Sequence, residues 1–231
     1  MGKSLFITGT GTGVGKTVVS SLLWGFCRQQ GMRAVYQKWV SSGGEQSEDL
    51  RFCLEHNSLP LNSGQGEVIF HFQLAASPHL AAEREGKMVD PDRIRTVFRQ
   101  ALTANELVLV EGAGGVLVPL RRDLLFADFV AELSLPALIV ARSGLGTINH
   151  TLLTIEALRG RGIPLLGVVL CDEEKEMAAD DVLVVDNQRV IEETGRVAVV
   201  GRLPRQADYG RLQQIFAPIG AAIAARLGGP G

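Results

Sequence analysis

The feature that most constrains this chain is a glycine-rich segment close to its start. Residues 5–21 have the sequence LFITGTGTGVGKTVVSS, which is a short apolar run, a loop with glycine at alternate positions and an apolar segment with helical spacing. A buried strand, a glycine loop and a helix start in this order cradle phosphate groups, because backbone N–H groups point inward and glycine permits close approach. Lys16 is expected to contact the terminal phosphates and Thr17 to bind Mg²⁺.

The loop departs at one position from the usual pattern G-x-x-x-x-G-K-[ST]. That pattern requires glycine at position 10, but Thr10 is there and the nearest upstream glycine is Gly9, so the loop is a variant with one more residue. The dinucleotide pattern G-x-G-x-x-G is absent, since its last glycine would fall on Val14 or Lys16. A flexible turn beside a chance Gly-Lys-Thr is the alternative, but the flanking strand and helix favour a phosphate site.

Composition argues against several classes of protein. The 231 residues have a net charge of −2 and are 46% hydrophobic, so the chain can bury a large core but has no basic block for nucleic acid. We expect no membrane contact, because no apolar stretch spans a bilayer and no signal region precedes the first strand. Three scattered cysteines favour a reduced, cytoplasmic protein without a metal cluster.

Apolar runs and helical spacing alternate along the chain. Strands are expected at residues 5–7, 34–40, 107–110, 136–141, 165–170 and 197–200, with a less regular extended segment at 64–72. Helices are expected at residues 17–30, 49–56, 77–85, 126–133, 147–159, 187–194 and 209–227, with another that begins at 90–91. Nearly continuous apolar strands between helices are typical of parallel sheets. The sequence therefore predicts one doubly wound, mainly parallel α/β domain over residues 1–231, with P-loop NTPase topology.

Candidate functional residues follow the expected strands. Right-handed crossovers bring the carboxyl ends of parallel strands to one edge of a sheet, where ligands bind. The glycine loop, Ser42, Glu111, Gly146 and Asp172 all come after strands, so we expect them to converge at that edge.

Three charged residues could act on a bound phosphate. Asp49 and Glu111 are candidate ligands for Mg²⁺, and Lys38 could stabilise charge on a transferred phosphoryl group. For Lys38, a solvated lysine that points outward is an equally open interpretation. Together these residues predict a Mg²⁺-dependent enzyme that uses a nucleotide, but they do not identify what accepts the phosphate.

A second glycine loop at residues 144–146 leads into a helix start at residues 146–149. Such a helix start could bind another anion, for example a carboxylate, whereas a plain N-cap by Thr147 is the alternative. The acidic segment 173–181 is expected to be a surface loop.

Six segments, in this order, resemble the dethiobiotin synthetase family. They are TGTGTGVGKT (8–17), YQKWVSSG (36–43), SPHLAAEREG (77–86), VEGAGGVLVPL (110–120), FADFV (126–130) and GLGTINHTLLT (144–154). The resemblance is strong over residues 1–172 and weak beyond. It implies an enzyme of biotin synthesis that joins 7,8-diaminononanoate and CO₂ (or bicarbonate) into the cyclic urea of dethiobiotin, with ATP as co-substrate, Mg²⁺ as metal and a homodimer as the assembly.

The resemblance also implies a reaction path and the residues that serve it. A carbamate of the diamine attacks the γ-phosphate to give a carbamic-phosphoric anhydride, and the second amine then closes the ring and expels phosphate. The residues that match the family's catalytic groups are Lys38, Lys16 and Thr12. Those that match its metal ligands are Thr17, Asp49 and Glu111. Those that match its substrate site are Ser42, Gly146, Thr147, Ile148 and Asn149, the last four contributed by the partner subunit. Those that match its nucleotide site are Gly13, Val14, Gly15, Lys16, Thr17, Val18, Asp49, Glu111, Gly112, Ala113, Gly114, Cys171, Asp172, Pro204, Arg205 and Gln206.

Three departures from the family pattern affect what can be expected. Trp39 replaces the proline that usually follows the active lysine, and Gly13 stands where some members have glutamate. Cys171 precedes Asp172 where the family has asparagine to recognise the base. A thiol donates and accepts hydrogen bonds poorly, so we predict a weakened preference for adenine.

Two other classes of protein are alternatives. A switch ATPase of the MinD or ParA type acts through partner binding and has a signature lysine at the place of Gly11, which this chain lacks together with a membrane-targeting tail helix. A synthase that amidates cobyrinic acid needs a glutaminase domain, for which 231 residues are expected to be too few.

Overall fold

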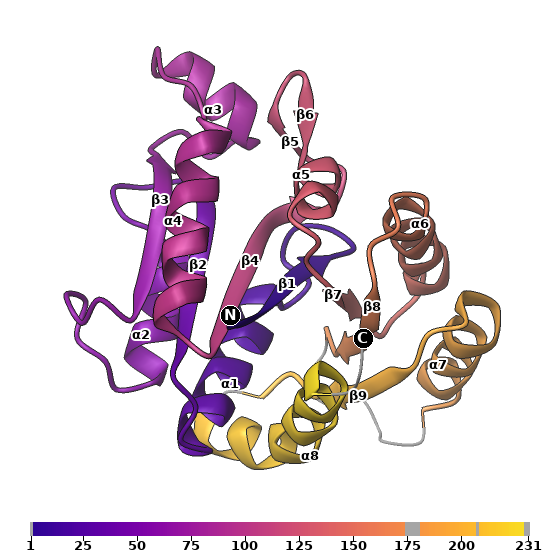
Figure 1. The fold of residues 1–231 in the computed structure, drawn as a ribbon. Coiled ribbons are helices and arrows are strands. Elements are labelled where there is room, and N and C mark those ends of the chain that lie inside the picture. The colour runs from indigo at the N-terminus through magenta and orange to yellow at the C-terminus, as the bar shows by residue number, and fades with distance from the viewer. Residues whose placement is uncertain (1, 174–180, 207, 229–231) are drawn as a thin grey trace.

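The centre of the molecule is a parallel sheet (Figure 1). The computed structural model describes residues 2–173, 181–206 and 208–228. Seven parallel strands lie in the order β3-β2-β4-β1-β7-β8-β9. They are β1 (Lys3–Gly9), β2 (Ala34–Ser42), β3 (Gly66–Phe72), β4 (Leu107–Gly115), β7 (Ala137–Arg142), β8 (Leu165–Cys171) and β9 (Val199–Leu203). This sheet confirms the predicted doubly wound, mainly parallel α/β fold.

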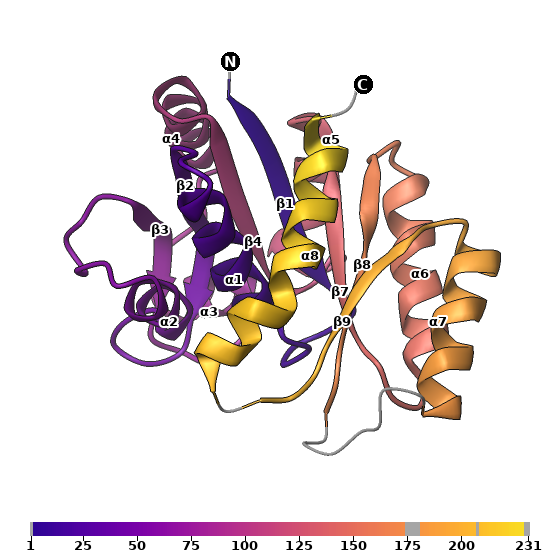
Figure 2. The same cartoon turned by 90° about the horizontal axis from the view of Figure 1, so that it is seen from below.

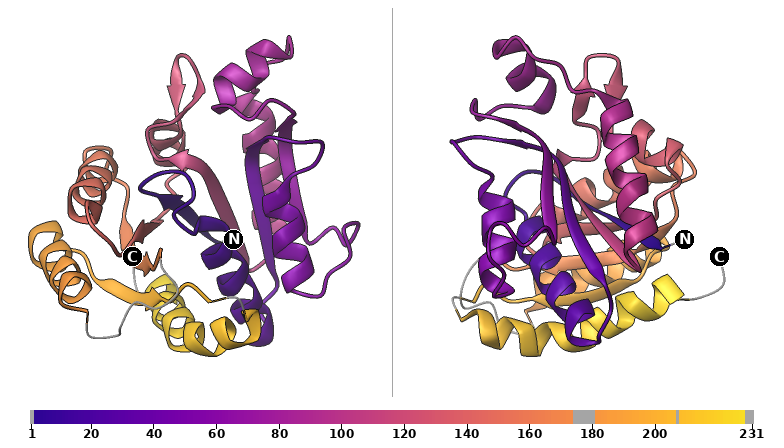
Figure 3. Two further views of the ribbon diagram at one scale, coloured as in Figure 1. Left: turned by 180° about the vertical axis from the view of Figure 1, so that it is seen from behind. Right: turned by 60° about the vertical axis from the view of Figure 1, so that its left-hand side comes forward.

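Helices cover both faces of the sheet, as Figures 2 and 3 show. One face carries α1 (Lys16–Gln29), α2 (Glu48–His56) and α8 (Tyr209–Gly228). The other carries α3 (Pro78–Arg84), α4 (Pro91–Ala104), α5 (Phe126–Glu132), α6 (Thr147–Arg159) and α7 (Val182–Gly195). A short antiparallel hairpin, β5 (Pro119–Arg121) with β6 (Leu124–Leu125), leads into α5.

Side-chain alternation explains why both faces of the sheet need a cover. Along β1, Leu5 and Ile7 belong to the core under α1 and α8, whereas Phe6 belongs to the core on the opposite face. All three side chains are fully buried. Strands that are apolar on both sides are stable only between two layers of helices, which is the arrangement found here.

Two strands extend further than the sequence indicated. The expectation that Ser42 follows the strand at 34–40 is wrong, because Ser41 and Ser42 continue β2 by pairing with His71 and Phe72 of β3. The strand that begins at Leu107 does not end at Val110 but continues to Gly115, so Glu111 lies inside β4 and not after it. The glycine-containing segment 112–115 thus belongs to β4, which lies beside β1.

The last strand lies further along the chain than predicted. The expected strand at 197–200 is wrong in its bounds, since β9 covers Val199–Leu203. Gly201 lies inside β9, and a Cβ at this position would lie 2.4 Å from Ile219 Cγ1 of α8, so close helix packing explains the glycine. Arg202 is accommodated in the strand because its Nε donates to Asp172 Oδ1 at 2.7 Å.

The helix expected at 187–194 begins earlier, at Val182. Its N-cap is Asp181, whose Oδ1 accepts from the backbone N–H groups of Leu183 and Val184. The expected acidic loop at 173–181 falls mostly on residues 174–180, which lie outside the described residues. Among the residues that the structure describes, no helix is both long and apolar enough to cross a membrane.

Candidate active site

The glycine loop between β1 and α1 holds its backbone open toward a ligand. Gly13 and Gly15 have positive φ values of 72° and 101°, which glycine adopts without strain. Gly15 is the N-cap of α1 and no side chain caps this helix, so no side-chain acceptor satisfies the N–H groups of its first turn. Lys16 Nζ donates to Gly11 O at 2.8 Å across the loop. The loop therefore has the form of a phosphate cradle.

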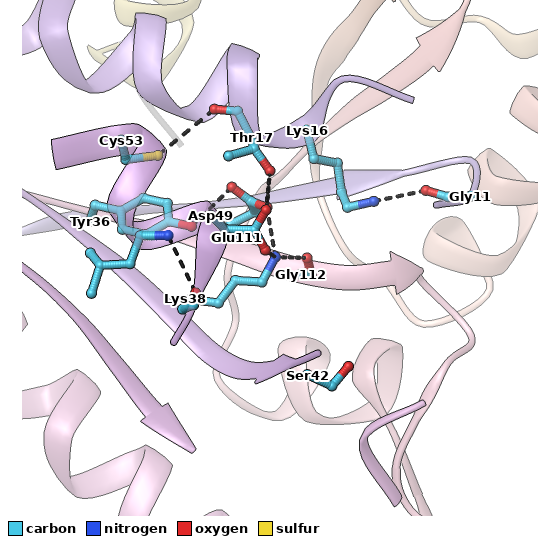
Figure 4. A network of polar contacts seen from close by, with 12 residues as sticks. Gly11, Lys16, Thr17, Tyr36, Lys38, Ser42, Asp49, Cys53, Glu111 and Gly112 are labelled. Atoms are coloured by element: carbon cyan, nitrogen blue, oxygen red, sulfur yellow. Dashed lines mark hydrogen bonds and ion pairs between the residues drawn. The ribbon is translucent and has the colours of Figure 1, made fainter. Parts of the chain in front are cut away.

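Lys38 and Glu111 meet because their strands are neighbours. The register pairs Lys38 of β2 directly with Glu111 of β4. Both side chains are buried, with only 3% and 1% of their surface exposed. Lys38 Nζ lies 2.7 Å from Glu111 Oε1, 2.7 Å from Asp49 Oδ2 and 3.1 Å from Gly112 O (Figure 4). All three ammonium donors thus have acceptors, and the solvated interpretation of Lys38 is wrong.

Three oxygen atoms converge beside the phosphate cradle. Thr17 Oγ1 lies 2.6 Å from Asp49 Oδ1 and 3.0 Å from Glu111 Oε1. Hard oxygen donors of this kind suit Mg²⁺, which usually takes one or two carboxylates from a protein and completes its shell with phosphate oxygens and water. The described residues contain no group of three or more His, Cys, Asp or Glu arranged to hold a metal, so a Mg²⁺ site here would depend on the hydroxyl and on a bound nucleotide.

Charge coupling sets the protonation states in this site. Burial alone would lower the pKa of Lys38, but Glu111 and Asp49 outweigh it and raise that pKa above its ordinary value. Burial would likewise raise the pKa of Asp49, yet Lys38 and Thr17 hold it below its ordinary value. Burial and the neighbouring charge of Lys38 lower the pKa of Lys16 to about 8. Lys16 is thus a poorly compensated cation that an anion would stabilise.

One cavity of 740 Å³ brings most of the predicted residues together. Its volume lies within the range of small-molecule sites. The predicted residues that line it are Thr12, Gly13, Gly15, Lys16, Thr17, Val18, Lys38, Ser42, Asp49, Glu111, Ala113 and Gly114. Gly112 is outside the lining but contributes its carbonyl to Lys38. The expected convergence at the strand ends is found for the glycine loop, Ser42 and Glu111.

A second cavity of 300 Å³ adjoins the first, since Gly13, Gly15 and Val18 line both. Its other predicted lining residues are Val14, Cys171, Asp172, Pro204, Arg205 and Gln206. Asp172 is already engaged, because its Oδ1 accepts from Ser143 Oγ at 2.6 Å and from Arg202 Nε at 2.7 Å. Burial raises the pKa of the Cys171 thiol to about 12, so this side chain is a neutral, weakly polar group.

The helix start after the second glycine loop adjoins the smaller cavity through Arg142, which lines that cavity, but contributes no residue to either lining. Gly146, Thr147, Ile148 and Asn149 line neither of them. The N-cap of α6 is Gly146, with φ of 87°, and Thr147 donates its hydroxyl to Arg142 O. The N-cap interpretation of Thr147 is therefore wrong. Gly146 and Asn149 are exposed, which leaves this helix start open to solvent.

Sequence reasoning missed several residues of the site. Tyr36 is fully buried and donates from its hydroxyl to Glu111 Oε2 at 3.1 Å. Its signal was available, because alternation along a strand places Tyr36 on the same face as Lys38. The segment 75–78 also lines the larger cavity, and Ser42 Oγ donates to Ala76 O at 2.7 Å. Arg142 and Glu173, which pair at 2.6 Å, line the smaller cavity.

Fold and site together define a class of protein. The strand, glycine loop and helix with Lys16 and Thr17, at the edge of a parallel sheet, make this chain a P-loop nucleotide-binding α/β protein. The cell division ATPase MinD of Pyrococcus furiosus has a similar fold, with a TM-score of 0.64 and 14% identity over 97% of this chain and 99% of that one. A ParA family ATPase from Chlorobium tepidum gives a TM-score of 0.56 at 12% identity over 99% and 98% of the two chains. At such low identity these likenesses concern the fold alone.

Sequence comparison narrows the class to one family. Residues 3–213 match the AAA domain family. The ATP-dependent dethiobiotin synthetase BioD of Rhodopseudomonas palustris (strain HaA2) is 42% identical over 90% of this chain and 88% of its own length. That of Nitrobacter hamburgensis is 38% identical over the full length of both, and that of Methanococcus vannielii is 36% identical over 89% and 95%. The chain belongs to the ATP-dependent dethiobiotin synthetase family.

Proposed function

We propose that this enzyme carboxylates 7,8-diaminononanoate with CO₂ and closes the ring to dethiobiotin, converting ATP to ADP and phosphate. The observation that carries the proposal is the buried Lys38, which lies at the junction of a phosphate cradle and a cavity large enough for a second substrate. A nucleotide-binding protein that only switches between partners needs no such cation beyond the cradle, whereas transfer of a phosphoryl group to a substrate oxygen does.

We assign the chain's own residues as follows. The backbone of the glycine loop and Lys16 bind the phosphates. Lys38 orients the carbamate oxygen toward the γ-phosphate and stabilises the negative charge that develops during transfer. To contact a phosphate oxygen, Lys38 must release at least one of its three present acceptors. Thr12 and Ser42, which line the same cavity, contact the diamine end of the substrate.

The two amines of the substrate supply both nitrogen atoms of the cyclic urea. One amine adds to CO₂ and loses a proton to form the carbamate. A carbamate oxygen then bonds to the γ-phosphorus as the bond to ADP breaks. The second amine attacks the resulting anhydride carbon and loses a proton as phosphate leaves, which closes the ring.

Thr17, Asp49 and Glu111 would hold Mg²⁺, which when bound neutralises phosphate charge. Tyr36 positions Glu111, since its hydroxyl engages the oxygen that faces away from Lys38. Such outer hydrogen bonds typically change metal affinity or activity by about 10- to 100-fold when they are removed.

Tyr36→Phe is accordingly expected to raise the Mg²⁺ concentration for half-maximal activity about 10-fold or more, with a smaller change in kcat at saturating Mg²⁺. The measurement is a Mg²⁺ titration of activity at fixed nucleotide. Tyr209→Phe is the matched control, because it removes a hydroxyl that donates only to Ser21 Oγ outside the site. Equal Mg²⁺ dependence in the two variants would contradict a positioning role for Tyr36.

The test of the proposed function is phosphate release by the purified protein with MgATP, bicarbonate and 7,8-diaminononanoate. Release that requires the diamine supports the proposal. Release that proceeds at the same rate without the diamine would favour a switch ATPase.

Base selectivity is expected to be weak, because neither Cys171 nor the engaged Asp172 presents an amide to adenine. We predict kcat/KM values for ATP, CTP and GTP within about 10-fold of one another, measured by dethiobiotin formation. Since a neutral hydrogen bond contributes about 0.5–1.5 kcal/mol, Cys171→Asn should increase the preference for ATP by roughly 2- to 10-fold. A strong preference for ATP in the unchanged enzyme would overturn this expectation.

We further propose a cytoplasmic homodimer, with each chain forming one P-loop domain over residues 1–231. The three free cysteines fit a reducing compartment. The exposed helix start at Gly146–Asn149, which does not reach its own chain's cavities, would supply the site that binds the carboxylate of the partner's substrate.

Asn149→Asp places a negative charge at that helix start and is expected to raise the KM for the diamine about 10-fold or more. If the helix start serves the partner subunit, a 1:1 mixture of Asn149→Asp and Lys38→Ala chains should regain about a quarter of the normal activity, because half of the dimers would contain one intact site. Activity that stays at the sum of the two separate variants would refute a shared site.

A further inference from the structure

A third cavity lies at the amino ends of the strands, whereas the proposed catalytic centre lies at their carboxyl ends. Its volume is 630 Å³, and it is formed where β8 and β9 begin. Figure 2 shows this end of the sheet, where β1 begins and α8 ends. Three arginines, Arg159, Arg196 and Arg226, line it together with apolar residues that include Ile163 and Val197. We propose that this cavity binds a small phosphorylated molecule with an apolar or planar body.

All charged side chains that line the cavity are positive. Arg159, Arg196 and Arg226 line it, no Asp or Glu does, and no salt bridge within the described residues involves any of the three. Arg159 Nη2 donates to Arg196 O at 2.8 Å, and Arg226 Nη1 donates to Ala222 O at 3.1 Å. Each guanidinium has five N–H donors, so most of them are left for a ligand.

Helix ends account for only part of this charge. Arg159 and Arg226 lie in the last turns of α6 and α8, and Arg196 caps α7. A helix C-terminus carries about −0.5 charge, so three of them compensate about half of the three positive charges. Lys3 Nζ, 3.8 Å from the position of a Cβ on Gly228, adds a further cation near the end of α8. The three exposed arginines thus outnumber the negative charge close to them, which includes Glu192 beside the start of β9, and an anion would bind against this excess.

The ligand class follows from the charge and from the floor of the cavity. A phosphoryl group carries about −1.5 to −2 charge and accepts paired hydrogen bonds from guanidinium groups, so it matches this cluster better than a single carboxylate does. The floor is apolar and includes the buried Ile163 and Val197. A ring or short hydrocarbon attached to the phosphate would cover this surface.

Phenyl phosphate is a suitable probe because it combines a phosphoryl group with a flat apolar body. It would be titrated calorimetrically into the full-length protein while a non-hydrolysable MgATP analogue saturates the catalytic centre. We expect one phenyl phosphate per chain, and binding of benzoate at least about 10-fold weaker. Failure to bind, or equal affinity for benzoate, would overturn the proposal.

Substitution then locates the site. Arg226→Gln breaks only a bond within its own helix and should weaken phenyl phosphate binding by at least about 5-fold, and Arg159→Gln together with Arg226→Gln should weaken it further. Arg189→Gln is the matched control, since it removes the same charge from an exposed position of α7 outside the cavity. An equal loss in Arg189→Gln and Arg226→Gln would show a general charge effect and contradict the site.

Discussion

Lys38→Ala is expected to lower kcat by about 1,000-fold or more while the Kd for MgATP changes by less than about 5-fold. The reason lies in where the ammonium group is. Lys38 comes from β2 and not from the glycine loop, and the acceptors of its ammonium group are Asp49, Glu111 and Gly112. It therefore acts on the group being transferred and contributes little to holding the nucleotide.

Lys16→Ala provides the contrast, because Lys16 belongs to the phosphate cradle itself. Loss of a hydrogen bond between charged groups costs about 1.5–3 kcal/mol, so nucleotide affinity should fall by roughly 10- to 150-fold along with activity. Affinities are best measured calorimetrically with MgADP, and activity by dethiobiotin formation. If the two variants lost nucleotide affinity equally, this division of roles between the two lysines would be wrong.

Because Lys38 is buried against two carboxylates, its removal also disturbs the fold. Breaking a buried ion pair from one side typically costs about 3–5 kcal/mol, and the partial exposure of Asp49 reduces that figure. Lys38→Gln, which keeps two donors and a similar length, is therefore measured beside Lys38→Ala. Both should retain nucleotide binding and lack turnover.

Trp39→Ala is expected to lower the free energy of unfolding by about 3–5 kcal/mol. Trp39 is fully buried, and its ring packs edge-on against Phe129, with the centroids 5.3 Å apart, and stacks with Phe6 at 6.1 Å. These contacts join β1 and β2 to α5. Since alternation along β2 places Trp39 on the face opposite Lys38, the variant should lose stability well before it loses the geometry of the site.

Urea unfolding followed by circular dichroism measures this loss. Trp39→Phe serves as the matched variant, because it keeps an aromatic ring in the same core and should lose at most about half as much stability. A loss below about 1 kcal/mol for Trp39→Ala would contradict the packing role assigned to this residue. Trp39 stands where the family usually has proline, and β2 continues unbroken past it to Ser42.

Much of the fold could be predicted because its signals are local. The segment from Leu107 to Val110 is apolar at every position, as a doubly covered strand requires, and the long helix from Tyr209 has a regular apolar face. The predicted bounds of strands are wrong where tertiary packing overrides local preference. The predicted strand ends at residue 200, but β9 continues through Gly201, where Ile219 of α8 leaves no room for a side chain.

For the site too, residues in a local sequence pattern were predictable, and residues that meet through the sheet were not. Lys16 and Thr17 are adjacent in a recognisable pattern, so the cradle was predictable. The pairing of Lys38 with Glu111 depends on the register of two strands that are 73 residues apart, which periodicity does not encode. Alternation along β2 does place Tyr36 beside Lys38, but the contact of Tyr36 with Glu111, like that of Arg202 with Asp172, depends on which strands are neighbours.

The most direct test of the central claim is to follow ¹³C-labelled bicarbonate in a reaction with MgATP and 7,8-diaminononanoate. If one centre couples phosphoryl transfer to ring closure, mass spectrometry will find the label in the cyclic urea of dethiobiotin, formed in equal amount to the phosphate released. Lys38→Ala should form neither. Phosphate released at an undiminished rate without the diamine, with no labelled ring, would contradict the account.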